Sequence, residues 1–144
     1  IRRNEANMKR LAFVISIAVA ALVAVMVHAK TESSRVQRVG MVIGIKPDKL
    51  SAYEALHDAS NPGVRDLLEK YHMHNFSIFV HQLEDGKFYL FGYYEYTGAD
   101  YKTDMEKLSA EPRNQKWLSA TDPMQIPLKG EKSWTMMQEV YHNP

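Results

Sequence analysis

The stretch HNFSIFVHQLEDGKFYLFGYYEYT, residues 74–97, decides the fold that this sequence predicts. In residues 74–83, large apolar side chains such as Phe76 stand at every second position, which is the period of a β-strand. Asp85-Gly86 is a strong signal for a tight turn, and the aromatic run at residues 88–97 then predicts a returning strand. The stretch therefore predicts an antiparallel hairpin that carries apolar side chains on both faces.

Upstream of this hairpin the sequence predicts a strand followed by helix. The run VGMVIGI, residues 39–45, is apolar and partly β-branched, as in a buried strand. Pro47 ends that strand, and helical spacing follows over residues 50–57. Asn61-Pro62 interrupts the pattern and offers an N-cap and a first helical residue for a second piece, residues 62–71. The two pieces are either separate helices or one kinked helix, since proline breaks the hydrogen-bond ladder.

Downstream of the hairpin, residues 100–110 and 112–120 have helical spacing with a proline at their junction, and residues 133–142 predict a last strand. The order β-α-β-β-α-β is the ferredoxin-like arrangement of the α+β class, with one antiparallel sheet and helices on one face. Because the hairpin strands carry apolar side chains on both faces, the other face of the sheet needs a cover. The simplest cover is a second copy of the chain, so we expect a homodimer.

The first part of the chain predicts an export signal. Met8-Lys9-Arg10 gives a basic start, residues 11–27 are uninterruptedly apolar, and small side chains precede a cleavage site after Ala29. The alternative is an uncleaved anchor, although the run is shorter than the roughly 20 residues that span a bilayer comfortably. In both cases we expect the folded domain outside the cytoplasm, periplasmic or secreted. It would contact the membrane only through residues 1–29, if these stay attached.

Residues 30–37 form a polar linker, and the predicted domain occupies residues 38–144. The whole chain has a net charge of +1, from 18 basic and 17 acidic side chains. Residues 1–29 contain four of the basic groups and one acid, so the remainder carries 14 basic and 16 acidic groups, a net charge of −2. A near-neutral domain lacks the basic surface of a nucleic-acid binder. The absence of cysteine excludes disulfides, thiolate metal sites and cysteine nucleophiles.

Two features could support chemistry on a small polar ligand. Tyr53 and His57 are four residues apart on the predicted helix and hence side by side, where they could hold a hydroxylated ligand and transfer protons near neutral pH. The alternative is a packed tyrosine beside a surface histidine. Trp117 stands among polar residues at a helical position. It could form an apolar wall against the C–H face of a sugar, or it could simply pack in the core.

A metal site is not predicted. His72 and His74 could share one face of an extended chain, but no acidic cluster accompanies them, and a zinc site usually needs three or four ligands. The favoured interpretation is that His72 and His74 are simply polar residues at the entry to a strand. The sequence also contains no glycine-rich phosphate loop, no Gly-x-Ser-x-Gly turn and no paired His-Glu zinc motif.

Several short motifs follow one another along the predicted domain: Lys46-Pro47-Asp48, Tyr53-Glu54-x-x-His57, Asn61-Pro62, the run from His74 to Phe79, Trp117-Leu118, the run from Thr121 to Met124, and the run from Gln138 to Tyr141 with Pro144. In this order they resemble the L-rhamnose mutarotase family, which consists of small dimeric α+β-barrel proteins. The resemblance covers nearly the whole predicted domain, and the chain order is far more specific than any single motif.

The resemblance implies a role for five residues. His57 would be the proton donor, the general acid/base, and Tyr53 would bind the sugar, while Phe76, Trp117 and Leu118 would line the sugar site. Phe76 stands where a tyrosine is typical of the family, and Leu118 where a second tryptophan is typical. The spacing from His57 to Asn61-Pro62 is also longer than usual.

The resemblance implies an enzyme that interconverts the α and β anomers of L-rhamnose or a related aldose, with no cofactor or metal. The alternative is a non-catalytic or respecialised dimeric α+β-barrel protein that binds a ligand in the family's pocket. The Tyr53–His57 pair favours the enzyme, whereas Phe76 and Leu118 favour the binding protein.

Overall fold

A computed structural model describes residues 36–143 of the chain, so the predicted signal sequence and nearly all of the linker lie outside the described residues. The elements of the described part are β1 (Gln37–Ile45), η2 (Pro47–Lys49), α2 (Leu50–His57), α3 (Arg65–Lys70), β2 (Met73–Gln82), β3 (Phe88–Tyr96), α4 (Tyr101–Ala110), α5 (Pro112–Thr121), η3 (Asp122–Met124), β4 (Gln125–Ile126) and β5 (Thr135–Met137). Among these residues, no helix has the length and apolar character that crossing a membrane requires.

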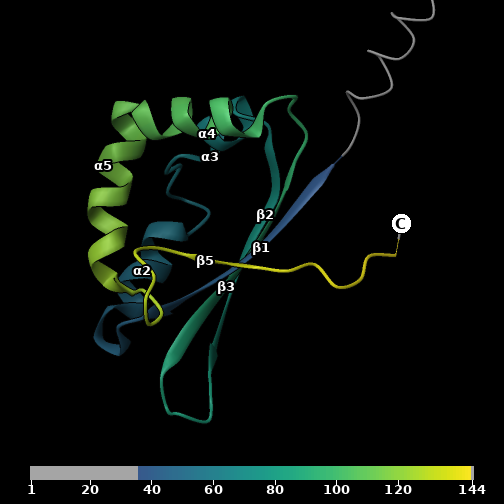
Figure 1. Ribbon diagram of the computed structural model, residues 1–144. Helices are drawn as coiled ribbons and strands as arrows, with labels where there is room; N and C mark the ends of the chain where they lie inside the picture. The colour runs from purple at the N-terminus through teal and green to yellow at the C-terminus, as the bar shows by residue number, and fades with distance from the viewer. Residues whose placement is uncertain (1–35, 144) are drawn as a thin grey trace, which may run out of the picture. The chain divides into compact units, whose positions relative to one another are not determined.

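The strands form one antiparallel sheet in the order β2-β3-β1-β4, and β5 also pairs with β1 (Figure 1). The two last strands share one edge of β1: β4 pairs with Gly44 and Ile45, and β5 pairs with residues 40–42. The predicted last strand, residues 133–142, is confirmed only over Thr135–Met137, and β4 was not predicted. The structure confirms the α+β class and the ferredoxin-like order of the main elements.

The predicted hairpin is formed by β2 and β3, and Gly86 takes the positive φ of 76° that its turn requires. Near its start β2 contains a register shift between His74 and Ser77, where Asn75 has a φ of 51°. This β-bulge is why Met73 and Phe76, three residues apart, both line the helix side of the sheet.

The helices α2 to α5 lie on one side of the sheet (Figure 1). The side-chain carboxylate of Asp100 caps α4 by accepting a hydrogen bond from the Thr103 amide at 3.0 Å.

The prediction that Asn61 caps a helix from Pro62 is wrong, since α3 begins only at Arg65. The Asn61 side chain accepts a hydrogen bond from the Gly63 amide, and the φ of +53° at Gly63 is incompatible with a continuing helix. The two predicted helical pieces are therefore separate helices.

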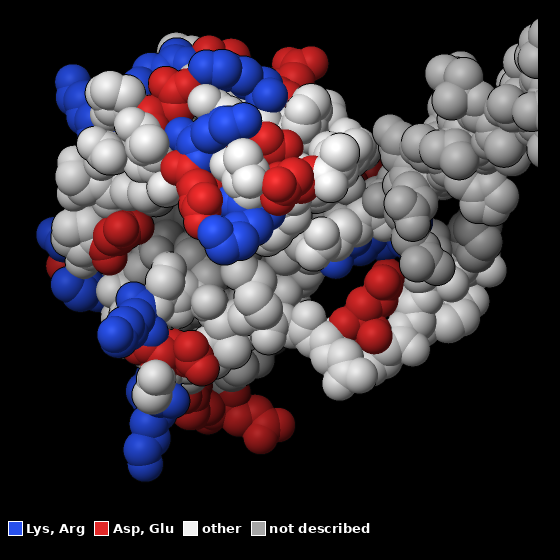
Figure 2. Space-filling view, turned by 45° about the horizontal axis from the view of Figure 1, so that its top comes forward, with Lys and Arg blue, Asp and Glu red and all other residues white. Residues whose placement is uncertain are grey.

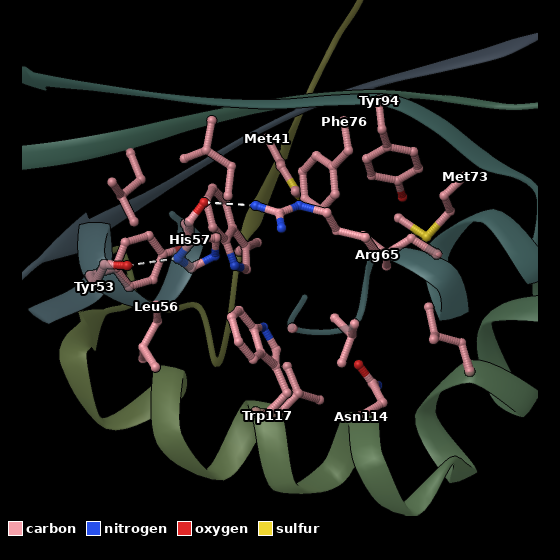
Figure 3. A pocket seen from close by; sticks show the side chains of 18 of the residues that line it. Met41, Tyr53, Leu56, His57, Arg65, Met73, Phe76, Tyr94, Asn114 and Trp117 are labelled. Atoms are coloured by element: carbon pink, nitrogen blue, oxygen red, sulfur yellow. Dashed lines mark hydrogen bonds between the residues drawn. The ribbon is translucent and has the colours of Figure 1, made fainter. Parts of the chain in front are cut away.

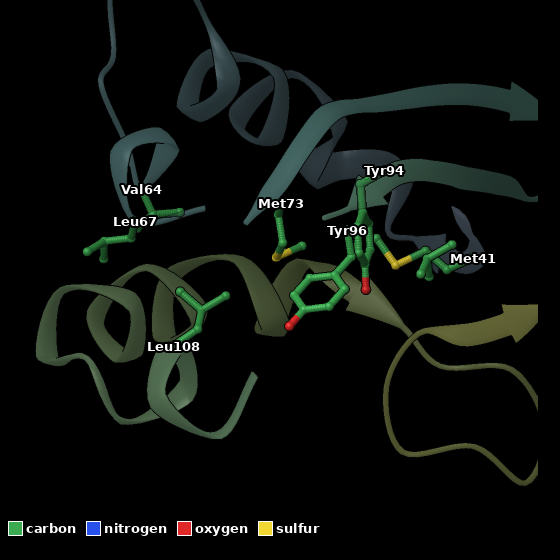
Figure 4. Close-up of a cluster of buried hydrophobic side chains, with 8 residues drawn as sticks. Met41, Val64, Leu67, Met73, Tyr94, Tyr96 and Leu108 are labelled. Atoms are coloured by element: carbon green, nitrogen blue, oxygen red, sulfur yellow. The ribbon is translucent and has the colours of Figure 1, made fainter. Parts of the chain in front are cut away.

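Two buried clusters fill the space between sheet and helices. The larger cluster joins both layers through Met41, Leu67, Met73, Tyr94 and Leu108, among others (Figure 4). The smaller one consists of Ile43, Ile45, Tyr53 and Leu90. Complete burial of an isoleucine such as Ile43 contributes roughly 1.5–3 kcal/mol, so the central strand β1 anchors the fold.

Charged side chains of both signs are interspersed over the face seen in Figure 2. Mixed charge of this kind matches the near-neutral balance of the sequence.

Candidate functional site

A pocket of about 850 Å³ opens between the helix side of the sheet and the helices α2 and α5 (Figure 3). This size lies in the range of small-molecule sites. Its wall is mostly apolar, with the polar side chains at a few places only. The polar lining residues are Tyr53, Glu54, His57, Asn61, Arg65, Tyr94, Tyr101 and Asn114.

His57 is the last residue of α2, and its ring stacks on that of Tyr53 with 4.2 Å between centroids. The Nδ1 atom of His57 lies 2.8 Å from the backbone carbonyl oxygen of Tyr53. A carbonyl oxygen can only accept, so Nδ1 carries the hydrogen and donates it. In the neutral ring, Nε2 is then the nitrogen with a free lone pair. The predicted adjacency of Tyr53 and His57 on one helix face is confirmed.

Tyr53 is buried, with 5% of its surface exposed. Burial raises the pKa of its phenol from 10.0 to about 12, opposed by the side chain of Gln125 and assisted by the negative charge of Asp122. The phenol therefore remains protonated near neutral pH. It can donate a hydrogen bond without exchanging its own proton.

Trp117 stands opposite this pair on α5, and its ring lies at 74° to that of His57 with 5.1 Å between centroids. Its indole lies directly over the backbone of Gly63, where an added Cβ would come within 3.1 Å of two ring carbons. Gly63 therefore serves two needs, a positive φ and a close approach by the tryptophan. Trp117 packs against the core and also lines the pocket. The structure therefore agrees with both interpretations of this residue, a core side chain and a pocket wall.

Arg65 holds the segment that leaves the helix of His57. Its guanidinium donates to the backbone carbonyls of His57 (2.8 Å), Asp58 (3.0 Å) and Asn61. The last carbonyls of a helix have no partner within the helix, and Arg65 satisfies them at the end of α2. No motif in the sequence signals this contact, because Arg65 lies eight residues beyond His57 and a turn separates them.

At the other end of the pocket, Phe76 packs edge-on against Tyr94 at 5.4 Å between centroids. The hydroxyl of Tyr94 lies 2.5 Å from that of Tyr101, and burial together with this bond raises the pKa of Tyr94 strongly. Leu118 lies at the rim and is 39% exposed. Asn114, on α5, is buried and lines the pocket.

His72 and His74, the two histidines considered as metal ligands, do not lie on one face of an extended strand. His72 has a φ of 63° in the turn before β2, and its Nε2 lies 3.9 Å from a carboxylate oxygen of Asp104. Residues 36–143 contain no group of three or more histidine, aspartate or glutamate side chains that could hold a metal ion.

Comparison with known proteins places this pocket in context. The family model described as L-rhamnose mutarotase matches residues 38–143. The chain belongs to the L-rhamnose mutarotase family. It is 31% identical to the L-rhamnose mutarotase of Oceanobacillus iheyensis over 107 residues, which are 74% of this chain and 97% of that protein. Membership in the L-rhamnose mutarotase family supports a sugar mutarotase function, that of an enzyme acting on sugars.

The fold is also that of a solved structure in the L-rhamnose mutarotase family. The crystal structure of the L-rhamnose mutarotase of Formosa agariphila aligns with a TM-score of 0.57 and 17% identity, over 75% of this chain and 99% of that one. All five residues that the resemblance assigned to the sugar site line the pocket of this chain: Tyr53, His57, Phe76, Trp117 and Leu118. The sequence did not indicate Arg65, Tyr94, Tyr101 or Asn114.

Proposed function

We propose that this protein interconverts the α and β anomers of L-rhamnose or a related aldose, with His57 as the general acid/base. The observation that carries the proposal is the tethered ring of His57, which leaves Nε2 as its one free nitrogen in a pocket of suitable size. Tyr53 on one side and Trp117 on the other restrict where a ligand can meet that nitrogen.

The reaction needs only proton transfers. Nε2 of His57 removes the proton of the anomeric hydroxyl and then gives it to the ring oxygen as the bond between that oxygen and the anomeric carbon breaks. The resulting open-chain aldehyde rotates about its bond to the next carbon. The former ring oxygen then attacks the other face of the carbonyl as its proton returns to Nε2 of His57, and Nε2 gives a proton to the new anomeric oxygen. No electrons are gained or lost, and the product is the other anomer.

Binding would come from groups around the histidine. The neutral phenol of Tyr53, which lines the pocket, would donate a hydrogen bond to a sugar oxygen, and the Trp117 indole is a flat apolar surface of the kind on which the C–H face of a pyranose packs. Phe76 has no hydroxyl, which removes one potential hydrogen bond to the sugar, worth about 0.5–1.5 kcal/mol. Leu118 supplies less apolar surface than a second indole would. For these reasons the substrate is proposed as L-rhamnose or a related aldose.

The test is saturation transfer by NMR between the two anomeric protons of L-rhamnose, with and without the protein. L-fucose, L-lyxose and D-galactose extend the series. We expect faster exchange that is lost in His57→Ala and kept in His142→Ala, which removes a histidine that does not line the pocket. Full activity of His57→Ala would refute the assignment of the acid/base.

The second candidate function is ligand binding without catalysis, favoured by Phe76 and by the exposed position of Leu118. Sugar binding by the wild-type protein, with no enhancement of exchange for any of the four sugars, would select this alternative.

We also infer that the protein is a homodimer, built through the side of the sheet that carries no helix. Phe79 and Phe91 are directly paired across β2 and β3 on that side, and Phe79 is 64% exposed. An exposed aromatic side chain on a sheet face that no helix covers favours a protein partner. Sedimentation should show a dimer for the wild type and for Ala120→Arg, on the helical layer, and a monomer for Phe79→Arg. A monomeric wild type would refute the inference.

The predicted export signal extends the proposal to the site of action, periplasmic or secreted. N-terminal sequencing of the protein from its native host should begin at Lys30. Recovery of the full-length chain in the membrane fraction would favour the uncleaved anchor instead.

A further inference from the structure

We propose that Asn114 is a specificity-determining residue, whose side-chain amide hydrogen-bonds a sugar hydroxyl remote from the anomeric carbon. This inference rests on the proposed function, because it assumes that the anomeric carbon lies beside His57. It adds a second polar contact at the opposite end of the same pocket.

The first observation is the state of the amide. Asn114 is only 7% exposed, yet it lines the pocket, and Figure 3 shows its side chain directed from α5 into the cavity. Among the described residues, the side chains of α5 that form hydrogen bonds are those of Arg113, Gln115, Ser119 and Thr121. The Asn114 side chain forms none with these residues. Buried amides in proteins nearly always have partners. An amide that faces a cavity and has no hydrogen-bond partner among residues 36–143 is placed to bind a ligand.

The second observation is its position relative to the acid/base. Asn114 and Trp117 are three residues apart on α5, so their side chains project from the same face of the helix. With a rise of about 1.5 Å per residue, they are separated by roughly 4.5 Å along the helix axis. The Trp117 ring lies 5.1 Å from that of His57. A pyranose stacked on Trp117 with its anomeric carbon at His57 would therefore direct a hydroxyl on its far side toward Asn114.

The third observation is the chemistry of the surroundings. Most of the wall at this end is apolar, with Met73, Met105 and Leu108 among the lining residues. Two other polar groups of the lining, the hydroxyls of Tyr94 and Tyr101, are paired with each other. The amide of Asn114 offers both a donor and an acceptor, which is the complement of a hydroxyl group. A sugar without a hydroxyl at this point would leave the amide unpaired and should therefore bind more weakly.

The experiment compares wild-type protein with Asn114→Leu, which removes the amide at similar volume, and with Gln115→Leu, a matched control on the exposed face of α5. Affinity is measured by ligand-observed NMR for L-rhamnose and its 2-, 3- and 4-deoxy derivatives, and anomer exchange is measured alongside. Loss of one neutral hydrogen bond corresponds to a factor of about 2–12 in affinity.

We expect the wild type to bind one deoxy derivative more weakly than L-rhamnose by this factor, and Asn114→Leu to bind both equally. The KM of the variant should rise with little change in kcat, since the contact is present in both ground and transition states. Gln115→Leu should behave as wild type. If Asn114→Leu does not fold, Asn114→Ala is read in the same way.

Equal discrimination between L-rhamnose and each deoxy derivative by the wild type and the variant would overturn the role of Asn114, while leaving mutarotation intact. Conversely, sugar binding that depends on Asn114 in a wild type without anomer exchange would support the amide contact and overturn the proposed catalysis.

Discussion

The contact between Gly63 and Trp117 allows a test of the pocket that does not depend on any substrate. In Gly63→Ala the new Cβ would lie 3.1 Å from two carbons of the indole, at a residue whose φ is +53°. The positive φ alone costs an alanine roughly 1–2 kcal/mol. The alanine also lowers the conformational entropy of the unfolded chain, which stabilises the folded protein by about 0.4–1 kcal/mol. Overpacking against the indole adds roughly 1–3 kcal/mol, so we expect a total loss of about 2–4 kcal/mol.

The matched control is Gly86→Ala in the hairpin turn. Gly86 has a φ of +76°, but a Cβ there would meet no atom within 4 Å. This variant carries the backbone strain without the overpacking, and we expect it to lose only about 1 kcal/mol. Thermal unfolding by circular dichroism measures both variants, and 1 kcal/mol corresponds to roughly 4–8 °C in a small domain. Equal losses of stability in the two variants would refute the packing of Trp117 over Gly63.

Three further perturbations follow from the structure. The pKa of Tyr53 is raised to about 12, so the unfolded chain releases this proton above pH 10 while the folded chain retains it. Its stabilising effect is therefore complete below pH 10 and lost as pH rises toward 12. Between pH 9 and pH 11.5, urea unfolding should show a loss of stability that is smaller in Tyr53→Phe than in the wild type by roughly 2 kcal/mol, since Tyr94 and Tyr96, whose pKa values are also raised, titrate in both proteins. Arg65→Met should lower the rate of anomer exchange with little change in sugar affinity, because it frees the segment after His57, whereas Arg113→Met removes an exposed ion pair and should be nearly neutral. Asp100→Ala removes the cap of α4 and should cost about 1 kcal/mol in chemical unfolding; an unchanged midpoint would show that the cap is dispensable.

The main elements of the fold were predictable because their signals are local. The alternation before Asp85-Gly86 and the apolar run of β1 each identify a strand without reference to the rest of the chain. The pairing of β4 with β1 involves two residue pairs and is set by how the chain returns from α5, so it left no pattern in the sequence. The start of α3 was misplaced because the φ of Gly63 excludes the helix that Pro62 would otherwise begin.

The same distinction between local signals and contacts set by the path of the chain applies to the site. Tyr53 and His57 were found because helical spacing alone makes them neighbours. Arg65 acts across a turn whose path no spacing rule gives. Asn114 could have been found from Trp117, three residues later on the same helix, once Trp117 was assigned to the pocket wall.

The bond from Nδ1 of His57 to the peptide carbonyl of Tyr53 has a consequence for the isotope effect of the reaction. With one ring nitrogen held by the backbone, every proton that the histidine gives or takes must pass through the other. Only one proton can be in transit at the imidazole at any moment. If no other site changes its preference for deuterium over hydrogen between the ground state and the transition state, the rate should fall linearly with the deuterium content of the solvent. A curved dependence would reveal a second proton carrier, such as an ordered water, moving in the same step.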